Sequence, residues 1–119
     1  MYRVRFYRNR RGEQPVLDYI RSLRGREDKD SRVKLEKIDD YIEALRQYGT
    51  AAGKPYIDHI GGEIWELRPL RDRIFFVAWN GDSFVLLHHF MKKTQKTPRN
   101  EIEQAKRELA DLRERGDYL

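Results

Sequence analysis

The dipeptide Asn80-Gly81 constrains the fold of this chain more than any other feature. It separates two runs rich in apolar and aromatic residues, 73–79 and 83–90. Asn-Gly in that position is a strong signal for a type I′ β-hairpin. A third such run, 63–67, lies just upstream and is joined to the hairpin by the short loop 69–72. The three runs together predict an antiparallel meander.

The rest of the chain predicts one more strand and three helices. Residues 2–8 alternate apolar with mostly cationic side chains, as in an amphipathic strand. Apolar residues at helical spacing predict a short helix opened by Pro15 and closed by Gly25, and a longer one that ends at Gly49. The expected helices span about 13–25, 29–48 and 97 onward. The segment 50–62, which contains glycines and a proline, is expected to be an irregular linker.

The predicted order β, α, α, β, β, β, α indicates an α+β fold. In it, a small antiparallel sheet, made of the N-terminal strand and the three-stranded meander, is packed by an N-terminal αα-hairpin and a C-terminal helix. With 119 residues, the chain is expected to form a single domain over 1–119. An aromatic content of 12% is too high for a disordered chain.

Composition excludes several classes of protein. The chain has no cysteine, which rules out disulfides, thiolate zinc sites and a cysteine nucleophile. No apolar run reaches the roughly 18 residues of a membrane span, and the first residues lack a signal-peptide core. We therefore expect a cytoplasmic protein without a structural metal. The net charge of +5 favours a polyanionic partner.

Cationic side chains gather where the meander strands are expected to end. Arg68 and Arg73 flank the same tight connection, and strand alternation lets their guanidinium groups converge. Lys92, Lys93 and Lys96 follow the last strand. A single exposed cation is usually interpreted as a contribution to solubility. Because these five cations all lie at strand ends or in loops, a role in binding and a role in solubility are both kept as interpretations.

Histidines and acids receive structural readings at this stage. His88 and His89 alternate faces, so at most one can enter a shared pocket, and a zinc site built from them and His59 is improbable. The acidic residues of the last helix are interpreted as a solvated face; these are Glu101, Glu103, Glu108 and Asp111. The arginines before Gly12 indicate either a second basic surface or charge protection of an edge strand; these are Arg3, Arg5, Arg8 and Arg10.

No familiar catalytic motif for nucleotide, ester or zinc chemistry is present. What remains is a cationic end of a sheet, with no metal ligands around it. Such a surface suits binding of a phosphodiester, and cleavage of one by charge stabilisation.

Several segments resemble the phage-derived, HigB-like branch of the RelE/ParE toxin superfamily. The resemblance covers most of the chain and is carried by residues 62–68 (GEIWELR), 73–76 (RIFF), 86–98 (LLHHFMKKTQKTP), Glu101-Ile102 and Ala105-Lys106. It implies the toxin of a type II toxin–antitoxin system, with a RelE-like fold. The implied partners are a cognate antitoxin of the helix-turn-helix type, the ribosome and mRNA.

The implied activity is metal-independent cleavage of mRNA on the translating ribosome, which needs no cofactor and inhibits translation. The RNA 2′-OH attacks the adjacent phosphate, leaving a cyclic phosphate and a free 5′-OH. By resemblance, Arg73 contacts the scissile phosphate, Arg68 supports it, and Lys93 stabilises the phosphate or leaving group. Further RNA contacts are expected from Lys92, Lys96, Lys54 and Arg99.

The general base does not transfer from the family. Where RelE has two lysines on the first meander strand, this chain has Ile64 and Glu66. Glu66, His88, His89 and Lys54 stay open as bases, with His88 and Glu66 ranked first. Tyr118 is the one aromatic residue that could supply a late catalytic group. Two other functions remain as alternatives: a ParE-like inhibitor of DNA gyrase, and a non-catalytic module that binds nucleic acid or protein.

Overall fold

The sheet is built around the hairpin that Asn80-Gly81 forms. The structure is a computed structural model, and it describes residues 1–116. Its elements are β1 (Arg3–Phe6), α1 (Pro15–Arg24), α2 (Lys29–Tyr48), the 3-10 helix η1 (Gly49–Ala52), β2 (Ile57–Gly61), β3 (Ile64–Leu67), β4 (Asp72–Trp79), β5 (Ser83–Met91) and α3 (Arg99–Arg115). The predicted α+β class is confirmed.

The five strands lie in the order β1-β5-β4-β3-β2. β3, β4 and β5 form the predicted antiparallel meander. The N-terminal strand β1, expected in an antiparallel sheet, instead pairs with β5 in parallel. Asn80 and Gly81 have positive φ angles of 55° and 78°, as a type I′ turn requires. Because Trp79 pairs with Ser83, the hairpin loop has one residue more than the two-residue turn, namely Asp82.

The prediction of an irregular linker over 50–62 is wrong. This segment forms η1 and then β2, which pairs antiparallel with β3 at the edge of the sheet. Only Ile57 of β2 is buried, so the strand lacks the apolar alternation by which strands are recognised. Pairing with β3, rather than intrinsic propensity, makes it a strand.

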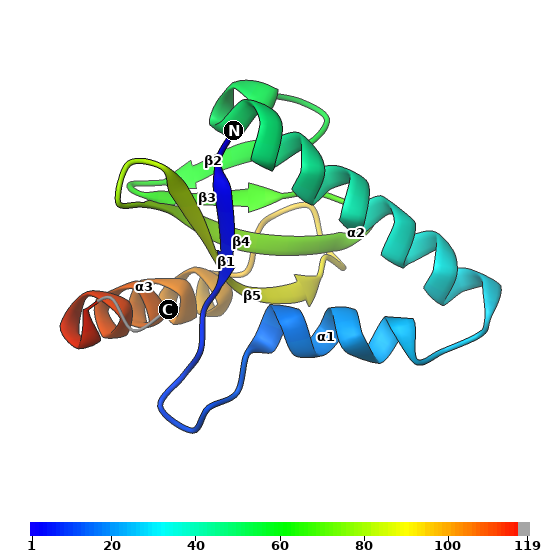
Figure 1. Ribbon diagram of the computed structural model, residues 1–119, viewed down its shortest axis with the longest axis horizontal. Coiled ribbons are helices and arrows are strands. Elements are labelled where there is room, and N and C mark those ends of the chain that lie inside the picture. Colours follow the sequence, from blue (N-terminus) through cyan, green and yellow to red (C-terminus); the bar gives the residue numbers. More distant parts are fainter. Residues whose placement is uncertain (117–119) are drawn as a thin grey trace.

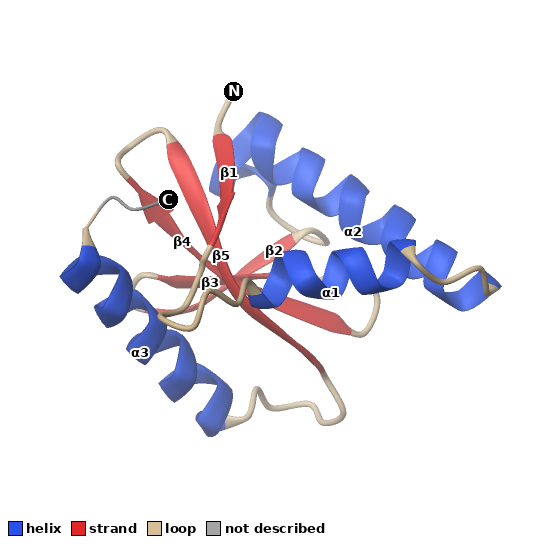
Figure 2. Ribbon diagram, turned by 60° about the horizontal axis from the view of Figure 1, so that its bottom comes forward, coloured by secondary structure: helices blue, strands red, loops and turns tan. Residues whose placement is uncertain are grey.

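The helices cover opposite faces of the sheet (Figures 1 and 2). α1 and α2 form the expected hairpin over one face, and α3 covers the other. The first core joins Ile20, Ile38 and Leu45 to Phe76 and Leu86, among others. The second core joins side chains of α3 to the opposite face; these are Ala105, Leu109, Leu112, Phe75, Val77 and Leu87.

The long helix α2 has the bounds predicted from the sequence, 29–48. The Asp28 carboxylate caps its first turn by accepting a hydrogen bond from the Ser31 N–H at 3.0 Å, and Gly49 ends it with a φ of 59°. Val33 and Tyr48 of this helix are exposed. Among residues 1–116, no helix combines the length and apolar character that crossing a membrane requires.

The acids of α3 do not form the solvated face predicted from the sequence. Glu108 is buried, and the side chains of Glu101 and Asp111 are largely covered. Of the four, only Glu103 is well exposed. Glu101 lies one helical turn before Ala105, and Glu108 lies one turn before Leu112, so both glutamates share the face that packs on the sheet.

Candidate phosphate-binding cleft

The connection between β3 and β4 brings two arginines onto one buried carboxylate. Arg68 follows β3, and Arg73 is the second residue of β4. Their Nε atoms lie 3.5 Å and 4.0 Å from the two oxygens of Glu66. The predicted convergence of Arg68 and Arg73 at one end of the sheet is confirmed.

Glu66 is too deeply buried to be a solvated partner of these arginines. It is 2% exposed, and its Oε1 has no hydrogen-bond partner among the described residues. Burial raises the pKa of Glu66, and the neighbouring Arg73, Lys92 and Arg68 only partly oppose that shift. The carboxylate therefore attracts both guanidinium groups by charge without hydrogen-bonding them at these distances.

Arg73 is held in place by the turn that precedes it. Its Nη1 donates to the carbonyl oxygens of Leu70 at 2.9 Å and Asp72 at 2.8 Å. The Asp72 carboxylate is buried and accepts from the Tyr19 hydroxyl of α1 at 3.0 Å to each oxygen. Burial lowers the pKa of Arg73, with Glu66 opposing, which fits a guanidinium group that lacks its full set of partners.

The segment after β5 supplies the other wall of a cleft of about 490 Å³. We call residues 92–98, which connect β5 to α3, the basic loop. The Lys92 N–H donates to the Arg71 carbonyl at 2.8 Å and joins the two walls. The residues lining this cationic cleft are Arg68, Leu70, Arg71, Arg73, Lys92, Lys93, Thr94 and Gln95.

Five of the eight lining residues are cationic, and none is acidic. Within residues 1–116, Lys92 and Lys93 take part in no ion pair. The buried carboxylates close to the cleft are Glu66, which pairs with Arg68 and Arg73, and Asp72, which acts on Arg73. Cations in excess over nearby carboxylates form a ready site for a phosphate group.

The other predicted base candidates lie outside this cleft. His88 is buried beneath α3 between two carboxylates, and His89 points to the opposite face and stacks on the Tyr19 ring with centroids 3.6 Å apart. Burial lowers the pKa of His89. Lys54 precedes a cis proline ahead of β2 and does not line the cleft. Tyr118 lies outside the described residues.

The predicted RNA-contact residues divide into two groups. Lys92 and Lys93 line the cleft, whereas Lys96 and Arg99 are exposed further along, in the basic loop and at the start of α3. Arg71 is a lining cation that the sequence reasoning missed. Its place in the loop between two expected strand-end arginines was the available signal.

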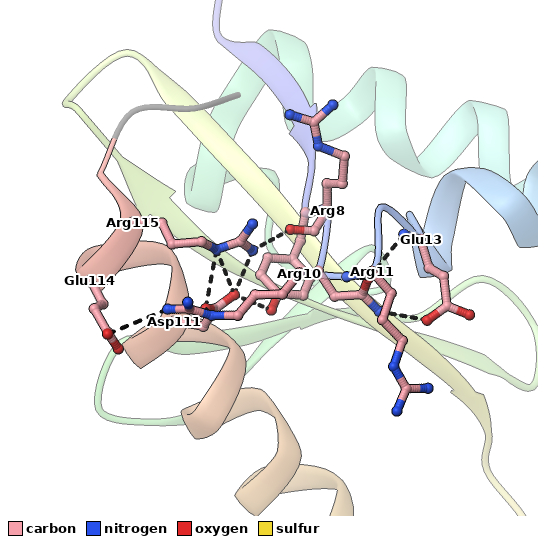
Figure 3. A network of polar contacts seen from close by, with 9 residues as sticks. Arg8, Arg10, Arg11, Glu13, Asp111, Glu114 and Arg115 are labelled. Carbon is pink, nitrogen blue, oxygen red and sulfur yellow. Dashed lines mark hydrogen bonds and ion pairs between the residues drawn. The ribbon is translucent and has the colours of Figure 1, made fainter.

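A second arginine-rich region lies at the opposite end of α3 (Figure 3). The Asp111 carboxylate accepts from the Tyr7 hydroxyl at 2.6 Å and from Arg10 Nε at 2.7 Å, and it also pairs with Arg115. Arg10 lies 3.4 Å from Glu114 as well. Arg10 is therefore engaged by two carboxylates and does not present a free basic surface.

No three or more His, Asp or Glu side chains are placed to hold a metal ion in the part of the chain that the structure describes. The cleft offers cations and hydrogen-bond donors, which suit an anionic ligand.

Comparison with known protein families gives a match that covers most of the chain. Residues 26–110 match the family model described as "Phage derived protein Gp49-like (DUF891)". The match begins ahead of α2 and ends within α3, so it contains every lining residue of the cationic cleft. No curated protein matches the chain.

Proposed function

The chain belongs to the phage-derived Gp49-like family, which is toxin-like, and from that premise we propose that it is a toxin that cleaves mRNA. The observation that carries this proposal is the cationic cleft. It presents Arg68, Arg73 and Lys93 together with two further cations, and among the described residues only the buried Glu66 forms ion pairs with them. A phosphodiester of single-stranded RNA matches this excess of positive charge.

The proposed reaction is a transesterification within the RNA. The 2′-oxygen forms a bond to the adjacent phosphorus while the bond from phosphorus to the 5′-oxygen breaks. The products are a 2′,3′-cyclic phosphate and a free 5′-OH. The proton of the 2′-OH passes to water, and the Lys93 ammonium group supplies a proton to the departing 5′-oxygen.

Charge stabilisation is the main contribution assigned to the protein. Arg73 and Arg68 bind the non-bridging oxygens, which gain negative charge as the fifth bond to phosphorus forms. The buried position of Arg73 supports this role, because a guanidinium group held in a low-dielectric site interacts more strongly with charge than one in water.

Glu66 is assigned a positioning role. Its carboxylate lies behind the two arginines, 3.5–4.0 Å from their Nε atoms, and is covered from solvent. It attracts the Nε edges of both arginines by charge, and because the Leu70 and Asp72 carbonyls use Arg73 Nη1, the Nη2 of Arg73 is the nitrogen assigned to the phosphate. His88 is not assigned as a base, because two glutamates of α3 occupy both of its ring nitrogens.

The partners proposed are those of a translation-blocking toxin. The mRNA is bound on the translating ribosome, where the exposed Lys96 and Arg99 add contacts to ribosomal phosphates beside the cleft. A cognate antitoxin, of the helix-turn-helix type, neutralises the protein by covering the cleft with an acidic segment.

Mapping mRNA 5′ ends by primer extension after induced expression tests the proposal. New ends within translated codons are expected for the wild type and are expected to disappear in Arg73→Ala. Arg113→Ala is the matched control, because Arg113 is an exposed arginine of α3 paired with Glu63, ahead of β3 and at the far end of that strand from Arg68. Growth arrest with intact mRNA would overturn the nuclease and leave gyrase inhibition; no arrest with folded protein would leave a binding module.

A further inference from the structure

His88 reaches α3 because the hairpin of β4 and β5 contains a bulge. The register shifts between Phe75 and Phe76, so that Phe75 pairs with His88 while Phe76 pairs with Leu86. The extra residue turns His88 toward the face covered by α3, where its ring contacts Phe75 edge-on at 5.5 Å between centroids. Bulges commonly redirect one side chain beside a functional site.

On that face His88 contacts two carboxylates of one helix. Its Nδ1 lies 2.6 Å from Glu108 Oε1, and its Nε2 lies 3.1 Å from Glu101 Oε1. Both contacts form together only when the trio holds one proton more than a neutral imidazole between two carboxylates. The contacts are then charge-assisted, which makes them stronger than neutral hydrogen bonds.

The same trio closes a loop that carries the cations of the cleft. His88 lies three residues before Met91, the last residue of β5, and Glu101 is the third residue of α3. The contact between them spans 13 positions of sequence, and the enclosed segment contains the whole basic loop. Holding the two ends of a loop together reduces the conformations open to the residues between them.

Inside the loop, few other contacts fix the backbone. The Lys92 N–H bonds to the Arg71 carbonyl, the Thr94 hydroxyl bonds to the Lys96 carbonyl at 2.9 Å, and the Glu101 N–H bonds to the Pro98 carbonyl. Lys93 and Gln95, which line the cleft, have exposed side chains. The position of Lys93 therefore depends on how firmly both ends of the basic loop are held.

We propose that His88, Glu101 and Glu108 form a lock between β5 and α3 that positions the basic loop for phosphate binding. The inference rests on the proposed function of the cleft, and it gives His88 a positioning role in place of the base role considered from sequence. The lock acts through Glu101, since that residue lies closest to the loop.

Amide hydrogen exchange at Lys92 and Ile102 tests the lock without reference to activity, because their N–H groups donate to the Arg71 and Pro98 carbonyls at the two ends of the basic loop. Glu101→Ala is the informative variant, because Glu101 lies in the first turn of α3 and is partly exposed, so its loss leaves the cores intact. Exchange at the Lys92 and Ile102 amides should become about tenfold faster. Glu101→Gln, which keeps an acceptor at the same reach, should restore most of the protection. Glu103→Ala, an exposed carboxylate of the same helix, is the matched control and should match the wild type.

Cleavage by Glu101→Ala, alone and combined with Lys93→Ala, tests the link to the cleft. The single change should lower cleavage about tenfold, and it should add less than about twofold when Lys93 is already absent. Equal losses in both backgrounds would reduce Glu101 to a general stabilising residue and overturn the proposal. Unchanged exchange at the Lys92 and Ile102 amides in Glu101→Ala would overturn it too. A wild type that cleaves no RNA would reject the proposed function, and the exchange result would still decide whether the lock exists.

Discussion

Two arginine-rich regions of this protein differ in the number of carboxylates that surround the guanidinium groups. In the cationic cleft of the described structure, only Glu66 forms ion pairs with any of the five cations, and the buried Asp72 carboxylate also lies near Arg73. In the network at the far end of α3, Asp111 and Glu114 engage Arg10, and Asp111 also binds Arg115 and Tyr7 (Figure 3). Counting arginines along the sequence makes the two regions look alike. Only the contacts distinguish them. At the far end of α3, carboxylates pair with Arg10 and Arg115, whereas the described structure gives ion pairs to only two of the five cations in the cleft.

The two carboxylates respond to their surroundings in opposite directions. Burial raises the pKa of Glu66, and its arginines are too far away to restore it. Burial acts in the same direction on Asp111, but hydrogen bonds from Tyr7, Arg115 and Arg10 outweigh it and lower the pKa to about 2. Ionised Asp111 therefore stabilises the folded protein, whereas burial of ionised Glu66 beside the cleft destabilises it.

The largest expected effect is on RNA cleavage, and it distinguishes the cationic cleft from the network at the far end of α3. Arg73→Ala should reduce RNA cleavage by about 10²–10³-fold, the range typical of losing one group that stabilises transition-state charge. Arg10→Ala should change cleavage by less than about twofold, because Arg10 is engaged by Asp111 and Glu114. Both variants are assayed with purified protein on translating ribosomes. A comparable loss for Arg10→Ala would erase the distinction.

A smaller effect is expected on stability, in the far network. Asp111→Asn should destabilise the protein by about 1–2 kcal/mol at pH 7, because it weakens hydrogen bonds to charged and hydroxyl partners. The folded-state pKa of Asp111 lies below its ordinary value of 3.8, so this stability is present above that pH and is lost as the pH falls toward about 2. Urea unfolding at several pH values should show the two proteins converging in acid. A gap independent of pH would contradict the assigned network.

The smallest effect concerns Glu66, and it has the opposite sign. Because the folded-state pKa of Glu66 is raised above 4.5, its contribution to stability is present at lower pH and is lost as the pH rises through the folded-state value. Glu66→Gln lacks this titration, so its Tm should improve relative to the wild type, by a few degrees at most, from pH 4 to pH 7. Thermal melts across that range measure the difference, and a relative decline would show that the arginines stabilise the Glu66 charge after all.

The elements that the sequence predicted are those with strong local patterns. The hairpin at Asn80-Gly81 and the 29–48 helix follow from turn chemistry and helical periodicity, and both are confirmed. β2 was missed because its residues carry no alternation and pair as a strand only when β3 is alongside. Its detection requires knowledge of the tertiary structure.

In the candidate site too, the features that follow from local patterns were predicted, and those that depend on tertiary contacts were missed. Arg68 and Arg73 were paired correctly from strand alternation, which fixes the face of each side chain. Glu101 and Glu108 were misplaced because acids on a helix are usually solvated. Their spacing with Ala105 and Leu112 is the signal that they face the sheet. Their partner His88 is turned toward them by a β-bulge in β5, and the local sequence pattern does not predict that bulge.

The most direct test of the central claim is the salt dependence of RNA binding. The probe is a single-stranded 2′-O-methyl RNA, which cannot be cleaved through its 2′-oxygen. Each phosphate contact in single-stranded RNA contributes about 0.7 to the slope of log affinity against log salt concentration. Replacing Lys92 and Lys93 with alanine should lower the slope by about 1.4, and Arg10→Ala should leave it unchanged. An equal fall in slope for Arg10→Ala, or an unchanged slope for the double lysine variant, would contradict the assignment of phosphate binding to the cationic cleft.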